Sequence, residues 1–505
     1  MDLTRKLSRL KGAGPGGARA AVLEVPRDEG AGYAGGDVAG QLEGLMTARE
    51  PGRPSFELEP PRLSADPREK VRQARIQHLR GLLVDFEARA AARAKAEAAR
   101  RAALPKVELP GARVETPHGP VRRVDHVLEP GHCHGRFPVQ DALTVEVEAL
   151  ARLAFDAALE GVDPAGALFI DTETTGLSGG TGTLPFLVGF ARFEAESLVV
   201  TQLLLEAPGE EAPMLEALKE AVEACSVLIS YNGKAFDWPL LATRFVLNRV
   251  APPAPKPHLD LLHVARRMFR ERLGGARLVT MEEEVLGMRR ERDIDGAEIP
   301  GVYWSFLRHR DGTQMAQVIE HNANDLVALA ALMGVVARRY QRLHAHDDPM
   351  DHLALAKVAA RAKDPTKAEL FARAAAEGGG EARTTVQASL LQAELCRKRG
   401  DAGRAQRALE EAVAAAGDDA ALAAPAHLAL AKLHEHLTKD LPLALVHARR
   451  AEPAEGAEAS LKRRSRLERR IVRGVLAAKT KRARRSSAER LPLEHAAGPL
   501  GVGSP

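Results

Sequence analysis

The hydrophobic pattern divides the chain into an α/β region and an all-helical region. Within residues 165–342, three apolar runs separated by turn residues predict successive strands: "ALFIDTET", "PFLVGFARFE" and "SLVVTQLLLE". The helical pattern "EEAPMLEALKEAVEAC" follows, and the apolar run "SVLISYNG" then predicts a buried parallel strand. The remaining patterns are helical, at 238–249, 260–272, 279–287 and 314–340. This order predicts an α/β domain with a mixed sheet and flanking helices.

Helix pairs rich in Ala and Leu begin after Asp351. Three copies of helix, short turn and helix align on Asp364, Asp401 and Asp440, so their spacings are 37 and 39 residues. The copies resemble tetratricopeptide repeats, whose period is about 34 residues, although the usual aromatic positions are missing. We therefore expect an all-α helical-repeat domain over 351–455, with a concave surface suited to a protein partner in nucleic-acid processing.

The remaining segments differ in composition from these two regions. Residues 1–65 are rich in Gly, Pro, Ala and charge and predict disorder, whereas 66–104 predict one long exposed helix. Residues 105–164 predict a small β-containing lead-in, and 461–505 a basic helix with a disordered tail. Between 461 and 485 there are twelve Lys or Arg and one acid. That run is consistent either with nucleic-acid contact or with a solvated tail.

Composition narrows the class of protein. The chain has 505 residues, 45% of them apolar, and a net charge of +4. The three cysteines, Cys133, Cys225 and Cys396, are too far apart in sequence for a disulfide framework or a four-ligand zinc pattern. The basic N-terminus lacks the apolar stretch of a secretory signal, and no apolar run reaches 18 residues. We expect a cytoplasmic protein without a membrane span.

Candidate chemistry begins at the end of the first strand of the α/β region. Asp171 and Glu173 are two residues apart, so their side chains leave the same face of the strand. Taken alone, such a pair is typical of a solvated turn. Asp237 stands at the start of a helix, where helix capping is the simplest interpretation. His321 and Asp325 are four apart on one helix face, which is also typical of an ordinary polar pair.

These residues become informative as a set. Four carboxylates with one imidazole and no cysteine favour Mg²⁺ or Mn²⁺ over zinc. So much negative charge is tolerated when two divalent ions, about 3.5–4 Å apart, fill the site. Such ions activate a water and stabilise both oxygens of an in-line phosphoryl displacement.

Three motifs now indicate a family. "DTETTGL", "NGKAFD" and "HNAND" resemble the exonuclease motifs of the DEDD superfamily of ribonuclease H-like 3′–5′ exonucleases, and the text between them resembles the YprB-type branch. The resemblance covers 165–342 and implies a ribonuclease H-like fold. It implies that the metal ligands are Asp171, Glu173, Asp237 and Asp325. By the same resemblance, substrate is positioned by Thr174, Leu177, Asn232 and Phe236.

The third motif departs from the family pattern. His321 occupies the position of the residue that orients or deprotonates the attacking water in the family. Family members carry either Tyr-x3-Asp or His-x4-Asp, whereas this chain has His-x3-Asp. The ligand assignment is unaffected by this difference, but the role of His321 as a general base depends on geometry.

The expected function is hydrolysis of nucleic acid from its 3′ end, with two Mg²⁺ or Mn²⁺ ions and release of nucleoside 5′-monophosphates. Single-stranded DNA or an exposed 3′ end is the expected substrate, with RNA as the alternative. A second hypothesis is a catalytically inactive ribonuclease H-like scaffold that binds nucleic acid and, through its repeats, a protein. The stretch "GLSGGTGT" lacks the Lys-Ser/Thr ending of a phosphate loop and predicts a flexible turn beside the site. The arginines of "GMRRER" either contact phosphates or lie on a solvated helix face.

Overall fold

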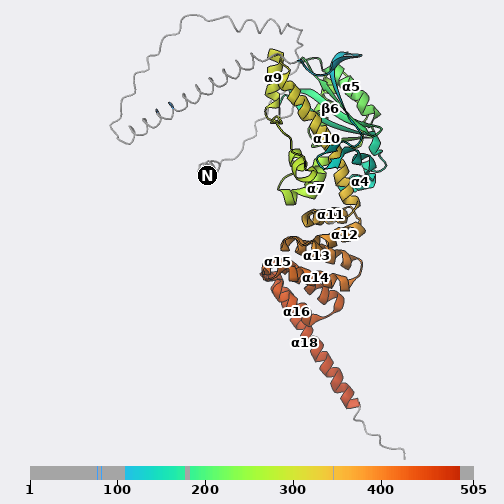
Figure 1. Cartoon of the computed structure of the whole chain (residues 1–505). Coiled ribbons are helices and arrows are strands. Elements are labelled where there is room, and N and C mark those ends of the chain that lie inside the picture. Colours follow the sequence, from blue (N-terminus) through green and yellow to red (C-terminus); the bar gives the residue numbers. More distant parts are fainter. Residues whose placement is uncertain (1–76, 78–80, 82–107, 177–181, 345, 489–505) are drawn as a thin grey trace, which may run out of the picture. The chain divides into compact units, whose positions relative to one another are not determined.

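The computed structural model describes residues 77, 81, 108–176, 182–344 and 346–488 (Figure 1). The expected disorder of 1–65 and of the final tail lies outside the described residues. So does nearly all of the helix predicted over 66–104, of which Gln77 and Gly81 are described and are helical. The glycine-rich turn is likewise outside them at 177–181.

The α/β region is built on a seven-stranded mixed sheet with the order β1-β2-β7-β6-β5-β8-β9. Its strands are β1 (Ala112–Thr116), β2 (Gly119–Leu128), β5 (Ala167–Thr174), β6 (Pro185–Glu194), β7 (Ser197–Leu204), β8 (Val227–Ser230) and β9 (His258–Asp260). The three predicted successive strands are confirmed as β5, β6 and β7. β8 runs parallel to β5, as its continuous apolar run predicts.

Two features of the sheet were not predicted. β1 and β2 of the lead-in segment extend it, because β2 pairs with β7. The short strand β9 pairs in parallel with β8, where the sequence indicated only the start of a helix. With three residues, β9 is too short to show a period-2 pattern.

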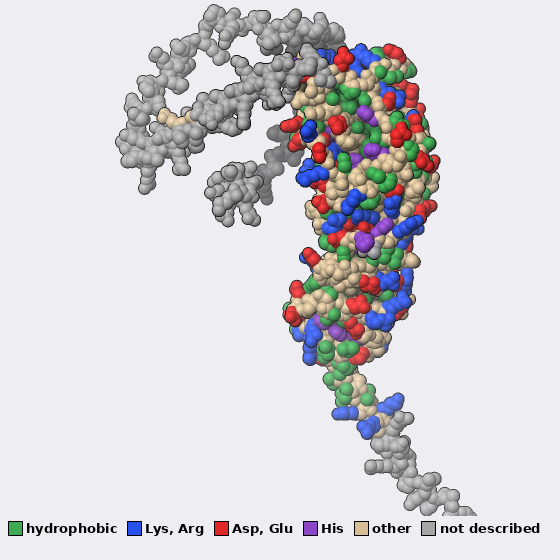
Figure 2. Space-filling model, viewed as in Figure 1, with side chains coloured by type: hydrophobic (Ala, Val, Ile, Leu, Met, Phe, Trp, Pro, Cys, Tyr) green, Lys and Arg blue, Asp and Glu red, His purple; other side chains and the backbone are tan. Residues whose placement is uncertain are grey.

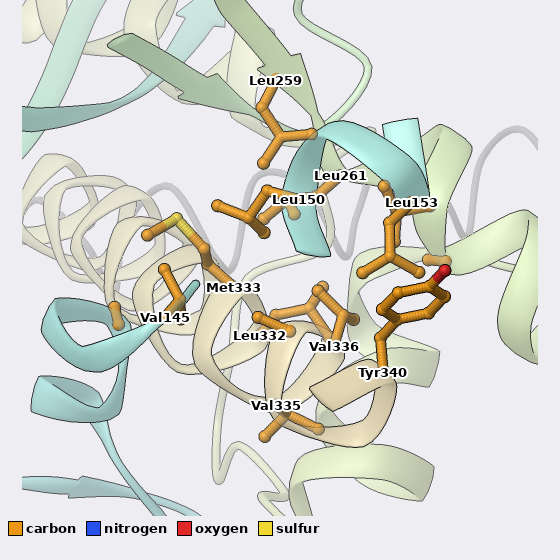
Figure 3. Packing of buried hydrophobic residues seen from close by; sticks show 14 of the residues in the cluster. Val145, Leu150, Leu153, Leu259, Leu261, Leu332, Met333, Val335, Val336 and Tyr340 are labelled. Carbon is orange, nitrogen blue, oxygen red and sulfur yellow. The ribbon is translucent and has the colours of Figure 1, made fainter. Parts of the chain in front are cut away.

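Helices cover both faces of the sheet. Leu168 and Ile170 pack in a core with α5 (Glu211–Ala224), α6 (Asp237–Leu247) and α9 (Ile299–His309). Phe169, which points the other way, packs in a second core with α4 (Val147–Ala154), α7 (Leu261–Leu273) and α10 (Thr313–Gln341). Figure 3 shows part of the second core, where Val336 and Tyr340 of α10 lie near Leu153 of α4. The long helix α10 crosses β5, β6 and β7 (Figure 1).

One predicted helix is divided. The segment predicted over 279–287 forms α8 (Leu278–Met281) followed by a π-helical turn, η5 (Glu282–Leu286). Gly287, with a φ of +71°, ends the turn in the left-handed region that glycine tolerates. The chain then enters a loop that carries "MRRERD". Helix α9 was not predicted at all; its sequence, "IPGVYWSFLRH", contains both Pro and Gly.

The C-terminal region consists of helix pairs. They are α11 (Pro349–Arg361) with α12 (Pro365–Glu377), α13 (Ala382–Lys398) with α14 (Ala402–Ala416), and α15 (Ala420–Leu433) with α16 (Leu441–Arg450). Asp364, Asp401 and Asp440, on which the copies align, each cap the second helix of a pair with a side-chain hydrogen bond. The helical-repeat prediction is confirmed. The short α17 (Glu452–Glu455) and the long α18 (Ala457–Ala488) follow.

Among the described helices, none is both long and apolar enough to span a membrane.

Candidate active site

The first pair of acids lies at the end of the central strand β5. Asp171 shares its sheet face with Phe169, the face that α10 crosses, and Asn322 of α10 donates a hydrogen bond to Asp171 Oδ2 at 2.8 Å. Gly189 of β6 is paired with Asp171, and a Cβ there would stand 2.1 Å from Asn322 Oδ1. Gln202 of β7 donates to that same oxygen at 2.8 Å. A buried amide chain and a glycine therefore hold Asp171 in place.

The third acid, Asp237, follows the loop after β8, and this loop is held by Asp260. Asp260 accepts hydrogen bonds from the backbone N–H groups of Asn232 (2.8 Å) and Lys234 (3.3 Å) while it also caps α7. Asn232 has a φ of +70°, which turns the chain sharply at this point. Asp237 is the first residue of α6, not its N-cap, which is Phe236. The capping interpretation of Asp237 is therefore wrong, and its carboxylate instead accepts a hydrogen bond from Thr172 Oγ1 of β5.

Helix α10 contributes the other two predicted residues. His321 Nε2 lies 4.0 Å from Glu173 Oε1 and 3.8 Å from Asp325 Oδ2. The other ring nitrogen, Nδ1, lies 2.7 Å from Asp293 Oδ1. His321 is thus oriented by a carboxylate on one side and directs its second nitrogen toward two acids of the site.

Arg290 is the main cation of the site, and sequence reasoning left its role open. Its side chain is 7% exposed, so a solvated helix face is wrong for this residue. The guanidinium pairs with Asp325, with Asp293 (3.2 Å) and with Glu282 (2.8 Å). Glu282 is 1% exposed and is also bonded to His134 Nε2 at 2.8 Å, so the short hairpin of β3 (Cys133–His134) and β4 (Phe137–Pro138) supports the same network.

The carboxylates act on one another electrostatically. Burial, followed by the charges of Asp325, Glu173 and Asp237, raises the pKa of Asp171 well above its ordinary value. Burial and the charges of Asp325 and Asp237 do the same to the pKa of Glu173. Burial also raises the pKa values of Asp237 and Asp325, although Arg290 opposes the shift at Asp325. Burial is the first cause at all four acids, and the charges of neighbouring carboxylates add to it at Asp171 and Glu173.

Three of the four residues predicted to position substrate lie in the described part of the chain. Phe236 is 56% exposed at the start of α6, beside Asp237. Thr174 Oγ1 donates to the carbonyl of Gly176 at 2.9 Å. Asn232 shapes the loop through its backbone, and Leu177 lies outside the described residues.

Several residues of the site were missed by sequence reasoning. Asn322 stands inside the quoted "HNAND" motif, so its proximity to the site was available. Nothing local marks Gln202, Asp293 or Glu282, because each meets its partner only through the tertiary fold.

The donor set suits a hard divalent ion, since it consists of carboxylates that raise one another's pKa and attract a guanidinium. Within the part of the chain that the structure describes, however, no three His, Cys, Asp or Glu side chains are already arranged to hold a metal. In this structure Thr172, Asn322 and Arg290 each engage one of the carboxylates.

Comparisons with known proteins agree with this fold. A family model described as the RNase_H superfamily matches residues 168–337. The chain is also 34% identical over 243 residues to the "Uncharacterized protein YprB" of Bacillus subtilis (strain 168). That match covers 47% of this chain and 58% of the relative's length. Residues 168–337 are therefore a ribonuclease H superfamily domain with a nuclease-like fold, in a chain similar to YprB over about half its length.

Proposed function

We propose that this domain is a metal-dependent 3′–5′ exonuclease that hydrolyses phosphodiester bonds in nucleic acid. One observation carries the proposal: carboxylates from β5, α6 and α10 lie together in a partly buried site, where burial and the charges of the neighbouring acids raise the pKa values of Asp171 and Glu173. Uncompensated like charge in a partly buried site destabilises a fold, and it is typical of functional sites.

Asp171, Glu173, Asp237 and Asp325 would hold two divalent ions, Mg²⁺ or Mn²⁺. Bound there, such ions supply an activated water and stabilise the charge that develops on the scissile phosphate. His321, held by Asp293 through Nδ1, presents Nε2 to the side of Glu173 and Asp325. Its proposed role is to orient the attacking water and to accept its proton. The contact between Nδ1 and Asp293 supports this role despite the unusual His-x3-Asp spacing, because it holds the ring in one orientation.

Substrate contacts are proposed on both sides of the acids. The exposed ring of Phe236 offers a stacking platform for a terminal base. A cavity of about 390 Å³ lies between the "MRRERD" loop and α10, and its charged lining consists of Arg289, Arg290 and Arg292 together with Glu291, Asp293 and Glu320. These arginines suit the phosphates of the strand. We propose DNA as the substrate, with RNA tested in parallel.

The test follows a 5′-labelled single-stranded DNA and a matched RNA with Mn²⁺, Mg²⁺ or EDTA. The wild type is expected to shorten the strand stepwise from its 3′ end when Mn²⁺ or Mg²⁺ is present, and not in EDTA. Asp171→Ala is expected to lower the rate by at least about 100-fold, since even partners of metal ligands contribute about 10–100-fold. Glu196→Gln, which removes an exposed acid from the β6–β7 turn, is the matched control.

Both variants are first shown to be folded by circular dichroism. If the labelled strand persists equally with folded wild type and Asp171→Ala, the enzyme proposal fails and the inactive nucleic-acid-binding scaffold replaces it.

A further inference from the structure

The basic run near the C-terminus divides into two parts in the structure. In the first part, three arginines of α18 surround Glu435, a residue of the π-turn η6 (His434–Thr438) that is 1% exposed. Arg466 and Arg470 each lie 2.8 Å from its carboxylate, and Arg463 lies 3.6 Å away. Arg463 and Arg464 also pair with Glu455 and Glu452. The beginning of α18 is thereby anchored, and these cations are already used.

The second part carries cations with no such use. Arg469, Arg473, Lys479, Lys481 and Arg482 are exposed, and none has an ion pair or side-chain hydrogen bond with any residue that the structure describes. Figure 2 shows Lys and Arg side chains, in blue, on this stretch of α18 just before the residues drawn in grey.

The same stretch has an uncovered apolar stripe. Val472, Val475 and Leu476 stand at i, i+3 and i+4 and are 57%, 50% and 58% exposed. Gly474 lies in the middle of this stretch and lowers its intrinsic helix stability. A solitary helix of this length is marginal in water, and repulsion among its cations weakens it further. A partner that supplies negative charge would stabilise it.

We propose that the free stretch of α18, residues 469–482, is a second nucleic-acid-binding surface that contacts the phosphate backbone outside the active site. Charge complementarity carries this choice of partner: five unpaired cations lie along about 20 Å of helix, where each turn can meet a phosphate. A membrane surface fits less well, because helices that lie on lipid have a broad apolar face with bulky or aromatic residues. The proposal rests on the proposed function only in taking nucleic acid as the ligand.

The anchored arginines sharpen the inference. From sequence composition alone, residues 461–485 either all contact nucleic acid or all belong to a solvated tail. The structure separates the arginines that pair with Glu435 from the cations that have no ion pair with any described residue. Substitution of the second set should therefore weaken nucleic-acid binding without loosening α18.

The experiment measures binding of the full-length protein to a labelled 30-nucleotide single strand by fluorescence anisotropy, in EDTA so that no turnover occurs. Salt is varied from 50 to 200 mM. The test variant replaces Arg473, Lys479, Lys481 and Arg482 with Gln. The control variant replaces four exposed, unpaired arginines of the repeats with Gln: Arg373, Arg383, Arg397 and Arg407. Both variants lose the same charge.

The slope of log K against log salt is expected to fall by about 3 for the test variant, at about 0.7 per lost contact, and to be unchanged for the control. An unchanged slope in the test variant, with its helix content retained by circular dichroism, overturns the proposal. So does tighter binding to vesicles containing phosphatidylserine than to the oligonucleotide, which would assign the stretch to a membrane. Because no metal is present, the binding result is independent of catalysis. If the test variant shows the expected decrease in slope but the wild type does not digest the strand in the nuclease assay, only the exonuclease proposal is rejected.

Discussion

The candidate active site and the anchor of α18 both pair buried charges, but with opposite signs in excess. In the first, several carboxylates converge on one buried guanidinium, that of Arg290. In the second, three guanidinium groups converge on one buried carboxylate, that of Glu435. Burial alone would raise the pKa of Glu435, but Arg466 and its neighbours lower it overall. At the site the balance has the other sign, and the pKa values of the acids are raised.

The difference is the one expected between a structural ion-pair cluster and the proposed active site. Around Glu435 the surplus cations are half-exposed: Arg466 and Arg470 are 47% and 38% exposed, so water completes their solvation. At the site the surplus is negative and Glu282 is fully buried beneath Arg290. The carboxylate of Glu435 is fully paired, whereas the acids of the site are the ones proposed to take up divalent cations.

The largest stability effect is expected from removing the lone cation of the site. Arg290→Gln leaves buried Glu282 with His134 alone and releases Asp325, and breaking such a buried pair costs about 3–5 kcal/mol. Urea unfolding followed by tryptophan fluorescence measures this, because both tryptophans, Trp238 and Trp304, lie in the ribonuclease H superfamily domain. A loss below about 1 kcal/mol would show that the network is not structurally important.

Metal addition is expected to have the next largest effect. At 100 times its dissociation constant, Mn²⁺ should stabilise the domain by about 2.7 kcal/mol, read as an increase in the melting temperature reported by tryptophan fluorescence. Asp325→Asn should lose most of this increase, while Glu196→Gln should keep it. Equal increases in the two variants would place metal binding elsewhere.

Removing the central acid of the anchor, Glu435, is expected to matter less. Glu435→Gln should destabilise the repeats by about 1–3 kcal/mol, because its arginine partners can turn to solvent. Hydrogen exchange in peptides covering α15 and α18 measures this locally. If Glu435→Gln accelerates exchange in these peptides more than Arg290→Gln does in peptides of the α/β domain, the anchor is the more important of the two networks for stability.

The smallest effect is a pH dependence of the repeats. Burial, followed by the charges of His427 and His434, lowers the pKa of His447 to about 4 from its ordinary 6.5. The folded state therefore binds fewer protons than the unfolded chain between these values, and stability falls as the pH drops from about 6.5 to 4. We expect a loss of about 1 kcal/mol, seen as reduced hydrogen-exchange protection of α15 and α16.

His447→Gln provides the control for that measurement. The variant should show a weaker pH dependence in the same peptides than the wild type. An identical loss of protection in both proteins would assign the effect to other groups.

Local patterns predicted the elements with strong periods. β5, β6, β7 and β8 have apolar runs bounded by turn residues, and α10 and the repeat helices have long amphipathic or Ala-rich patterns. The Asp residues that align the repeats are caps, and capping is a local interaction. By contrast, β9 and the π-turn η5 depend on neighbouring strands and on the docked hairpin at His134, so no local period indicates them.

The sequence by itself determined which side chains have the carboxylate and imidazole groups proposed to bind metal, because residue type and spacing are local properties. Only the tertiary structure decided how their charges are balanced. Arg290 meets Asp325 across 35 residues, Gln202 meets Asn322 across 120, and Asn322 meets Asp171 across 151. The same holds for α18, where only the fold distinguishes the arginines held by Glu435 from those left free. The physical reason is that a charge is compensated by whatever the packed chain places within a few ångströms, and sequence separation carries no information about that distance.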